Sequence, residues 1–239
     1  MILGIMQPYF FPYLGYFDLI HYSTRWVVFD TVQYIRHGWV NRNRILHPEK
    51  GWQYITVPLA KHSRETLIQD VRVSNDDSWR GRILGQLQHY RKKAPFYHDV
   101  YELVQECLSI PERSLSRLNV LIIERLCSFL GIRFDYAFFS DMELALGPVT
   151  EPGDWALRIS EELGAEEYVN PPGGEHLFDK SKFAESGILL TIREFPIFYY
   201  NCNGYLFEPH LSIIDALMWN PAATVTQFFE TWRTTDGRT

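Results

Sequence analysis

The sequence predicts an α/β protein with a mainly parallel β-sheet and helices on both of its faces. Two stretches predict this class. Over residues 1–30, an apolar strand pattern, a short helical pattern and a second apolar strand pattern follow one another. Over residues 154–192, helix and strand patterns alternate again. Strands separated by helices pair in parallel, because each helix carries the chain back across the sheet.

The composition indicates one globular unit, or one core with a smaller subdomain. The 239 residues are 46% apolar and 22% charged without a long block of like charge, which excludes intrinsic disorder. No apolar run reaches the roughly 18 residues of a membrane span, and the N-terminus lacks a signal-peptide pattern. The net charge of −6 disfavours nucleic acid as a partner. The three cysteines show neither metal-binding nor redox spacing, so we expect a cytoplasmic protein with reduced thiols.

The elements of the first half follow from local patterns. Buried strands are predicted where apolar residues run together, at residues 1–6, 26–30 and 54–59. Residues 14–21 have the spacing of a short helix, whereas Pro8 and Pro12 indicate a stiff loop before it. Apolar side chains then recur at helical spacing in three segments, 76–90, 96–108 and 109–130. The last segment opens with Ser109-Ile110-Pro111-Glu112, which fits a capping box, and Gly131 fits a helix end.

The second half continues the alternation of helix and strand. Strands are predicted at residues 134–139, 167–170 and 188–193. Helices are predicted at residues 154–163 and 211–219. We therefore expect an α/β core formed by residues 1–75 and 131–239, with residues 76–130 as a helical insertion or subdomain.

Three segments are candidates for a binding site, because open α/β sheets bind ligands beyond the carboxyl ends of their strands. They are residues 7–16, 30–44 and 170–179, each of which follows a predicted strand. We expect the first two to meet across a shared pocket.

The first segment contains Gln7 and three tyrosines, Tyr9, Tyr13 and Tyr16, which we expect to line the pocket. Its Tyr-x-Gly-Tyr pattern resembles the phosphate loop of nucleotidyltransferases, which have His-x-Gly-His there, and implies a Rossmann-like, nucleotidyltransferase-like sheet. A phenol donates a hydrogen bond but carries no positive charge near neutral pH, so adenylyl transfer by that route is in doubt. The alternative is an aromatic loop that packs on the sheet.

The second segment is rich in arginine and carboxamide side chains. The guanidinium groups of Arg42 and Arg44 match the geometry of phosphate or carboxylate. The amides of Gln33, Asn41 and Asn43 suit neutral partners such as sugar hydroxyls. In an extended chain the two arginines face away from the two asparagines. A solvated hairpin with a turn at Gly38 is the alternative.

The third segment begins with Asn170 and includes the paired glycines Gly173 and Gly174, whose N–H groups can approach an oxygen-rich ligand. His176 is a candidate general base, with Asp30 as the other candidate. A turn that only ends a strand is the alternative.

Asp215 falls within a predicted helix that is apolar on all sides, where a carboxylate needs donors or a cation. It either completes a capping box with Ser212 or pairs with an arginine of residues 42–44.

Several common enzyme signatures are missing from the sequence. The histidines lack ligand spacing, so no metal site is predicted. The sequence contains no Walker loop, no Gly-x-Gly-x-x-Gly and no Gly-x-Ser-x-Gly elbow. It also lacks the hexapeptide repeat of left-handed β-helix acyltransferases.

Six segments, in order along nearly the whole chain, resemble the WbqC-like protein family. They are Met6–Tyr16, Asp30–Tyr34, Trp39–Ile45, Thr56–Leu59, Asn170–Gly174 and Leu211–Asp215. The family is associated with bacterial loci for O-antigen lipopolysaccharide and other surface polysaccharides. The resemblance implies a transferase that N-acylates, or aminoacylates with a group such as glycyl, the amino group of a nucleotide-linked deoxy-amino sugar.

This interpretation leaves the co-substrate open. The acyl donor is a coenzyme A thioester, an acyl adenylate or an aminoacyl-tRNA, and the net charge weighs against the last. Two alternatives stand beside the transferase. One is a non-catalytic protein that binds a sugar nucleotide on a degenerate nucleotidyltransferase-like fold, and the other is an ATP-dependent amide ligase. The sequence indicates no oligomeric state.

Overall fold

The computed structural model describes residues 1–235, which divide into two compact units. Unit 1 comprises residues 1–7, 15–29 and 133–196. Unit 2 comprises residues 8–14, 30–132 and the chain from residue 197 onward. This division differs from the expected one, because residues 30–75 and the C-terminal segment group with the helical block. Among the described residues, no helix combines the length and the apolar character needed to cross a membrane.

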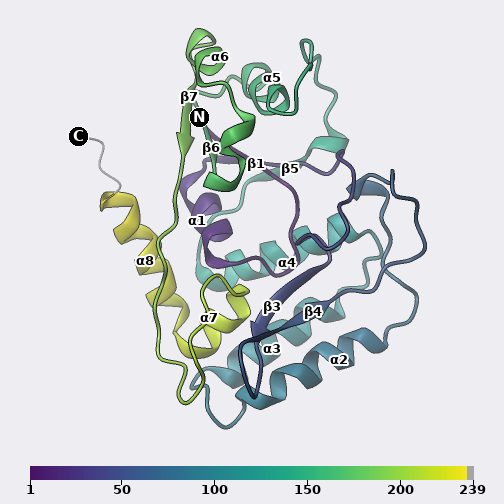
Figure 1. The fold of residues 1–239 in the computed structure, drawn as a ribbon, viewed down its shortest axis with the longest axis vertical. Helices are drawn as coiled ribbons and strands as arrows, with labels where there is room; N and C mark the ends of the chain where they lie inside the picture. Colours follow the sequence, from purple (N-terminus) through teal and green to yellow (C-terminus); the bar gives the residue numbers. More distant parts are fainter. Residues whose placement is uncertain (236–239) are drawn as a thin grey trace. The chain divides into compact units, whose positions relative to one another are not determined.

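Unit 1 contains a five-stranded parallel sheet, so the predicted α/β class is confirmed (Figure 1). The strands are β1 (Ile2–Met6), β2 (Arg25–Val28), β5 (Tyr136–Phe138), β6 (Glu167–Asn170) and β7 (Leu189–Ile192). Their order is β5-β2-β1-β6-β7. The order reverses at β1, which places a topological switch point between β1 and β6.

Helices cover both faces of this sheet. The helices are α1 (Leu14–Tyr22), α5 (Asp154–Glu162) and α6 (Lys180–Glu185), with short 3₁₀ turns at Phe139–Asp141 and Pro172–Leu177. Figure 1 shows α1 on one side of the sheet and α5 and α6 on the other. Leu3, Val27 and Ile159 are fully buried in the core between these layers. Gly4 on β1 is required by packing, because a Cβ there would lie 2.5 Å from the Trp26 ring.

Unit 1 also buries an ion pair. Arg193, which follows β7, donates through Nε and Nη2 to the carboxylate of Asp18 on α1, at 2.5 and 2.9 Å. Both side chains are 1% exposed. The guanidinium lies 4.6 Å from the centre of the Tyr22 ring. This polar contact joins the end of an edge strand to a helix of the same unit.

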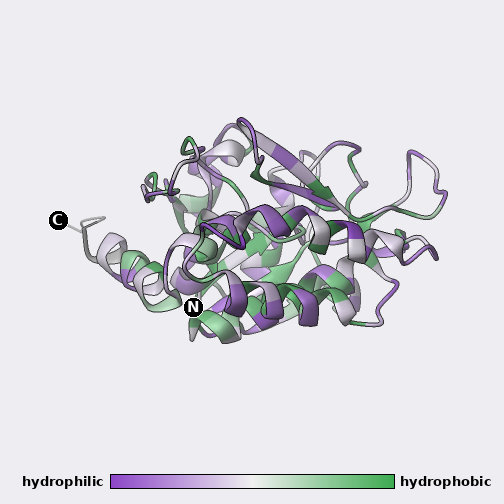
Figure 2. Cartoon of the chain, turned by 90° about the horizontal axis from the view of Figure 1, so that it is seen from below, coloured by the Kyte–Doolittle hydropathy of each residue, from purple (hydrophilic) through white to green (hydrophobic). Residues whose placement is uncertain are grey.

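Unit 2 is built from a β-hairpin and five α-helices. Its elements are β3 (Arg42–Leu46), β4 (Trp52–Thr56), α2 (Ser78–Gln86), α3 (Tyr97–Ser109), α4 (Leu115–Leu130), α7 (Ile213–Trp219) and α8 (Ala222–Thr235), with 3₁₀ turns at Ile68–Asp70 and Leu87–Tyr90. Helix α2 packs against β4, and α7 packs against β3. The helices carry hydrophobic and hydrophilic residues in alternating bands, as amphipathic packing requires (Figure 2).

The hairpin corrects one expectation about the sheet. Residues 54–59 are predicted as a strand of the α/β core, but β4 pairs only with β3, antiparallel, in a separate two-stranded sheet. The turn between them uses Gly51 at φ 60°, not Gly38. Ile45 and Ile55 on one face of the hairpin are fully buried. That face needs an apolar cover, which explains why the helices of residues 78–130 fold with this hairpin.

Helix boundaries show where local signals are misleading. The capping box predicted at residues 109–112 does not start a helix, because α3 runs to Ser109 and α4 begins at Leu115. The Glu112 carboxylate instead accepts from the backbone N–H of Arg113 and Ser114. Gly131 ends α4 in the left-handed conformation, as predicted. Helix α8 was not predicted from the sequence, although Pro221 directly before it is a helix-start signal.

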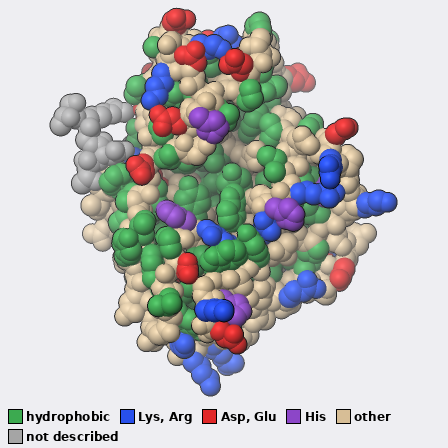
Figure 3. All heavy atoms as spheres, viewed as in Figure 1, with side chains coloured by type: hydrophobic (Ala, Val, Ile, Leu, Met, Phe, Trp, Pro, Cys, Tyr) green, Lys and Arg blue, Asp and Glu red, His purple; other side chains and the backbone are tan. Residues whose placement is uncertain are grey.

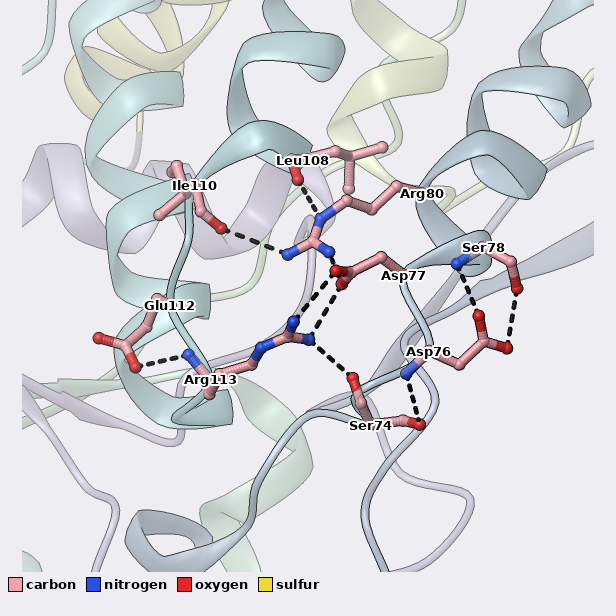
Figure 4. Close-up of polar contacts among 9 residues, drawn as sticks. All are labelled: Ser74, Asp76, Asp77, Ser78, Arg80, Leu108, Ile110, Glu112 and Arg113. Atoms are coloured by element: carbon pink, nitrogen blue, oxygen red, sulfur yellow. Dashed lines mark hydrogen bonds and ion pairs between the residues drawn. The ribbon is translucent and has the colours of Figure 1, made fainter.

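A polar cluster ties the start of α2 to the segment between α3 and α4 (Figure 4). Asp77 forms ion pairs with both Arg80 and Arg113. Arg80 also donates to the carbonyls of Leu108 and Ile110. The cluster therefore joins the start of α2 to the end of α3 and to the segment that leads into α4.

Candidate functional site

Strand β3 presents its two arginines on one face and Asn43 on the other, as the alternation of an extended chain predicts. Asn43 is 4% exposed, whereas the arginines are partly exposed. In the hairpin register, Arg44 lies opposite Tyr54 and Arg42 opposite Thr56. The arginines therefore share a face with the aromatic side chains of β4.

Three loops around β3 contain a non-glycine residue in the left-handed region of backbone conformation. These are Phe11 at φ 41°, His37 at φ 66° and His210 at φ 55°. Each of their carbonyls accepts a hydrogen bond from a different β3 side chain. Asn43 donates to Phe11 at 2.9 Å, Arg42 to His37 at 2.6 Å and Arg44 to His210 at 3.5 Å. Such backbone outliers cost energy and concentrate at functional sites, so β3 is the strongest candidate in unit 2.

Aromatic rings lie against both guanidinium groups. The Arg42 guanidinium lies 4.0 Å from the centre of the Tyr54 ring. The Arg44 guanidinium lies 5.2 Å from the Trp39 ring and 5.0 Å from the Trp52 ring. We call these five residues the basic–aromatic face. Figure 3 shows Lys, Arg and His side chains set among hydrophobic ones on the side of unit 2 that carries the hairpin.

The charges of the basic–aromatic face are not neutralised within the described part of the chain. Neither Arg42 nor Arg44 forms an ion pair there, and the Nε atom of each has no hydrogen-bond partner. Trp39 and Trp52 are 37% and 39% exposed. Two unpaired guanidinium groups between exposed aromatic rings suit an anionic ligand that also carries a flat or apolar ring face.

Tyr13 lies close to this face through the segment before α7. It forms an isolated antiparallel bridge with Ser212, and its ring packs edge-on against His210 at 6.1 Å. The Ser212 N–H donates to the Arg44 carbonyl at 2.8 Å. Residues 8–14 and 41–44, which the sequence predicts to meet, are therefore in contact within unit 2.

The carboxamide side chains of Asn41 and Asn43 form hydrogen bonds with other groups of the protein. Asn43 donates to the carbonyls of Phe10 and Phe11, and its Oδ1 accepts from the Arg44 N–H. Asn41 accepts from the Tyr34 hydroxyl and donates to the Val57 carbonyl. These hydrogen bonds fix the loops on the hairpin, which is a different role from the predicted reading of sugar hydroxyls.

The tyrosines of residues 9–16 have separate environments. Tyr9 belongs to unit 2, and burial raises the pKa of its hydroxyl. Tyr16 belongs to unit 1, is 1% exposed and donates to the Gln7 carbonyl at 3.0 Å. Tyr16 is therefore a core residue that packs against Trp26, not a residue that lines a pocket.

The remaining polar candidates of unit 2 are Asp30 and Gln33. Asp30 is 2% exposed and accepts from the Ser116 hydroxyl in the first turn of α4. A carboxylate beside the first turn of a helix is stabilised by the helix dipole. Gln33 is exposed and donates to the Arg64 carbonyl.

Asp215 forms neither of the two predicted contacts. Ser212 does cap α7, accepting from the Ile214 N–H, but the Asp215 carboxylate accepts from Tyr90 at 2.5 Å and Tyr200 at 2.6 Å. The Tyr90 hydroxyl in turn accepts from the Leu46 N–H. Burial raises the pKa of Asp215 to about 6, although these hydrogen bonds oppose the shift. Asp215 is therefore an interior residue that joins α7 to β3.

The third predicted segment belongs to unit 1. Asn170 is 6% exposed at the end of β6, where it accepts from Tyr168. Gly174 is required by packing, because a Cβ there would lie 2.5 Å from the Asn170 amide nitrogen. Gly173 has open space where a Cβ would lie, and His176 is exposed.

The comparisons with known proteins agree with the family resemblance of the six sequence segments. The model of the WbqC-like protein family matches residues 7–227, a range that contains β3 and all of the candidate residues. The chain belongs to the WbqC-like protein family. It is 29% identical to the uncharacterized protein Rv1507c of Mycobacterium tuberculosis over 235 residues, which cover 95% of this chain and 96% of that protein. No solved structure matches.

Four contributors to the site in this family member are not among the residues predicted from the sequence, namely Trp39, Trp52, Tyr54 and His210. Tyr54 was predicted only as a strand residue and Trp52 lay outside the predicted strand, although alternation places both on one face of β4. His210 was set aside for lack of metal-ligand spacing. Its backbone is left-handed and its carbonyl accepts from Arg44, which is 166 residues away in the sequence.

Proposed function

We propose that this protein is a transferase of surface-polysaccharide sugar biosynthesis that N-acylates the amino group of a nucleotide-linked deoxy-amino sugar. The observation that carries the proposal is the basic–aromatic face, where Arg42 and Arg44 lack a carboxylate partner among the described residues and lie against aromatic rings. Membership of the WbqC-like family supports it.

The chemistry of a nucleotide sugar matches this face in two respects. Its diphosphate is an anion that guanidinium groups bind through charge-assisted hydrogen bonds. Its base and sugar have apolar faces that pack against the exposed rings of Trp39 and Trp52. In this proposal the arginines hold the diphosphate and the tryptophans hold a ring of the substrate.

N-acylation needs a group that accepts a proton. The neutral amine of the sugar attacks the acyl carbon of the activated donor, the amide bond forms, and the bond to the donor's leaving group breaks. The proton lost by the amine passes to a base. Asp30 is buried against Ser116, so exposed imidazoles suit this role better. In unit 2, His210 lies beside Arg44, and in unit 1 His176 is exposed.

The first experiment measures binding of dTDP- and UDP-amino sugars by titration calorimetry. Arg42→Gln and Arg44→Gln are each expected to weaken binding about 10- to 100-fold, because a charge-assisted contact contributes about 1.5–3 kcal/mol. Arg82→Gln on α2 is the matched control, since Arg82 is also exposed but lies outside the basic–aromatic face. Unchanged dissociation constants in the Arg42 and Arg44 variants would remove this face from the site.

The second experiment tests transfer itself. The protein is incubated with a dTDP-amino sugar and with acetyl coenzyme A, an acyl adenylate or glycyl-tRNA, and the products are identified by mass spectrometry. The expected product is heavier than the sugar nucleotide by the acyl group less one hydrogen. His210→Gln and His176→Gln are compared for loss of kcat and of its pH dependence, which identifies the imidazole that accepts the proton.

A sugar-nucleotide-binding protein without catalysis is the second candidate. One observation favours it, namely that phenols occupy positions 13 and 16 and supply no charge for a leaving pyrophosphate. Binding without product for every donor would establish this alternative. Stabilisation by ATP alone in a thermal-shift screen would instead indicate the ATP-dependent amide ligase.

A further inference from the structure

Unit 2 contains an open pocket of about 460 Å³ that the proposed function does not use. Two segments of the chain form it, and its lining residues are Gln33, Tyr34, Ile35, Arg36, His37, His62, Ser63 and Arg64. We call it the anion pocket. Its volume falls within the roughly 300–1,000 Å³ typical of sites for small molecules, and is larger than a single small anion needs.

Hydrogen bonds between the two segments give the anion pocket fixed walls. The Tyr34 N–H donates to the Thr66 carbonyl at 2.9 Å, and Gln33 forms an isolated antiparallel bridge with Leu67. The Gln33 side chain donates to the Arg64 carbonyl, and the Tyr34 ring packs edge-on against His62 at 5.2 Å. The pocket is therefore held by contacts across it.

The lining of the anion pocket is basic and contains no carboxylate. Arg36 and Arg64 come from opposite segments, and neither forms an ion pair with another described residue. His37 and His62 add two imidazoles. The His62 Nδ1 lies 2.9 Å from the Ala60 carbonyl, while its buried Nε2 has no partner among the described residues. The lining therefore brings together two guanidinium groups without a carboxylate to balance them, which favours an anionic ligand.

His37 connects the anion pocket to the basic–aromatic face. Its backbone is left-handed, and its carbonyl accepts from Arg42 at 2.6 Å. Arg42 therefore positions a pocket residue while its own guanidinium lies against Tyr54. The two sites are neighbours in unit 2, but they have separate guanidinium groups.

We propose that the anion pocket binds the diphosphate group of a second small molecule, distinct from the sugar nucleotide on the basic–aromatic face. A diphosphate spreads its charge over two adjacent groups, as Arg36 and Arg64 spread theirs over two segments. Ile35, which is 63% exposed, and Tyr34 offer apolar surface for the rest of such a molecule. A nucleoside diphosphate and coenzyme A share this chemistry. Binding here does not depend on the transferase activity.

The test measures binding of inorganic pyrophosphate, ADP and coenzyme A to the full chain by titration calorimetry. At least one ligand is expected to bind, with Arg36→Gln and Arg64→Gln each weakening it tenfold or more. The titrations are fitted with two sites, because the basic–aromatic face also suits a diphosphate. Arg44→Gln, which alters that other face, and Arg82→Gln, an exposed control, are expected to change the binding that depends on Arg36 and Arg64 less than twofold. Tighter binding of ADP than of pyrophosphate identifies a nucleoside diphosphate, and tighter binding of coenzyme A than of ADP identifies the coenzyme.

Three results would overturn the proposal. One is the absence of binding to all three ligands. Another is binding that the Arg36 and Arg64 variants leave unchanged. The third is binding that Arg44→Gln abolishes, which would assign the ligand to the basic–aromatic face. Circular dichroism confirms that each variant is folded, and His62→Gln provides an independent change in the lining. The two proposals can fail separately. If Arg44→Gln loses sugar-nucleotide binding but keeps pyrophosphate binding, the two ligands occupy different sites.

Discussion

Arg193 in unit 1 and the two arginines of β3 in unit 2 have opposite environments. In unit 1, Arg193 is 1% exposed and forms a two-point ion pair with Asp18, which is equally buried. In unit 2, Arg42 and Arg44 are partly exposed, lie against aromatic rings and pair with no carboxylate among the described residues. The first arrangement satisfies the guanidinium within the protein, whereas the second leaves its charge for a ligand.

This difference gives a physical criterion for sorting polar residues into structural and ligand-binding ones. A buried charge must be compensated inside the fold, because burying it alone costs several kcal/mol. A charge at a partly exposed site remains solvated, so the protein can leave it without a partner until a ligand binds. By this criterion Asp18, Arg193 and Asp215 are structural. Arg42 and Arg44, and Arg36 and Arg64, remain the proposed binding residues because they also lie against aromatic rings or line a pocket.

The largest expected effect comes from breaking the unit 1 pair. Asp18→Asn removes the compensating charge and leaves the Arg193 guanidinium buried. We expect the free energy of unfolding to fall by about 3–5 kcal/mol, measured by urea denaturation. Sugar-nucleotide affinity in the fraction that remains folded is expected to stay unchanged.

A double variant sharpens this prediction. Asp18→Leu combined with Arg193→Met removes both charges, and it is expected to recover most of the stability lost in Asp18→Asn. If Asp18→Asn cost less than about 1 kcal/mol, the pair would not be a structural one, and the contrast with unit 2 would fail.

A smaller effect is expected from Asp215, whose carboxylate accepts hydrogen bonds from two neutral phenols. Burial raises its pKa in the folded state to about 6, against an ordinary aspartate value of 3.8. The folded state therefore binds a proton more tightly than the unfolded state, so this group adds stability as the pH falls from about 6 toward 4. Between pH 7 and 4.5 the gain is about 2 kcal/mol.

The comparison of wild type with Asp215→Asn isolates that gain. Other groups titrate in both proteins, so the difference between their free energies of unfolding reports Asp215 alone. We expect the wild type to gain about 2 kcal/mol relative to the variant between pH 7 and pH 4.5. A difference that is constant across this range would show that Asp215 is ionised in the folded protein at both pH values.

The sequence predicts the strands of the protein better than it predicts the partners of its buried polar side chains. The strands of unit 1 are predictable because they are apolar runs, and β6, which is buried on both faces, is predicted at its observed bounds. The alternation of Arg42, Asn43 and Arg44 also follows from strand geometry alone. The partners of Asp215 do not, because Tyr90 and Tyr200 lie far from it in sequence and local patterns carry no signal of long-range contacts.

The same reason explains the error at the hairpin, whereas the error at residues 109–112 has a local cause. Local spacing identifies β4 as a strand but does not say which strand it pairs with. Ser109-Ile110-Pro111-Glu112 has the spacing of a capping box, but Glu112 bonds to Arg113 and Ser114 just before α4. The contact of His210 with Arg44 on β3 likewise joins residues far apart in the sequence.

The smallest effect is expected at the Asp77 cluster, which tests the criterion where ion pairs are exposed. The Asp77 side chain is 53% exposed although it pairs with two arginines. Solvent screens such pairs, so Asp77→Asn is expected to lower the free energy of unfolding by about 1 kcal/mol or less. The loss should shrink further in 1 M salt, and Arg113→Gln should add little to it because both variants remove the same pair. A loss above about 3 kcal/mol would mean that exposed pairs stabilise this fold as strongly as buried ones, and partial exposure would then no longer mark Arg42 and Arg44 as ligand-binding residues.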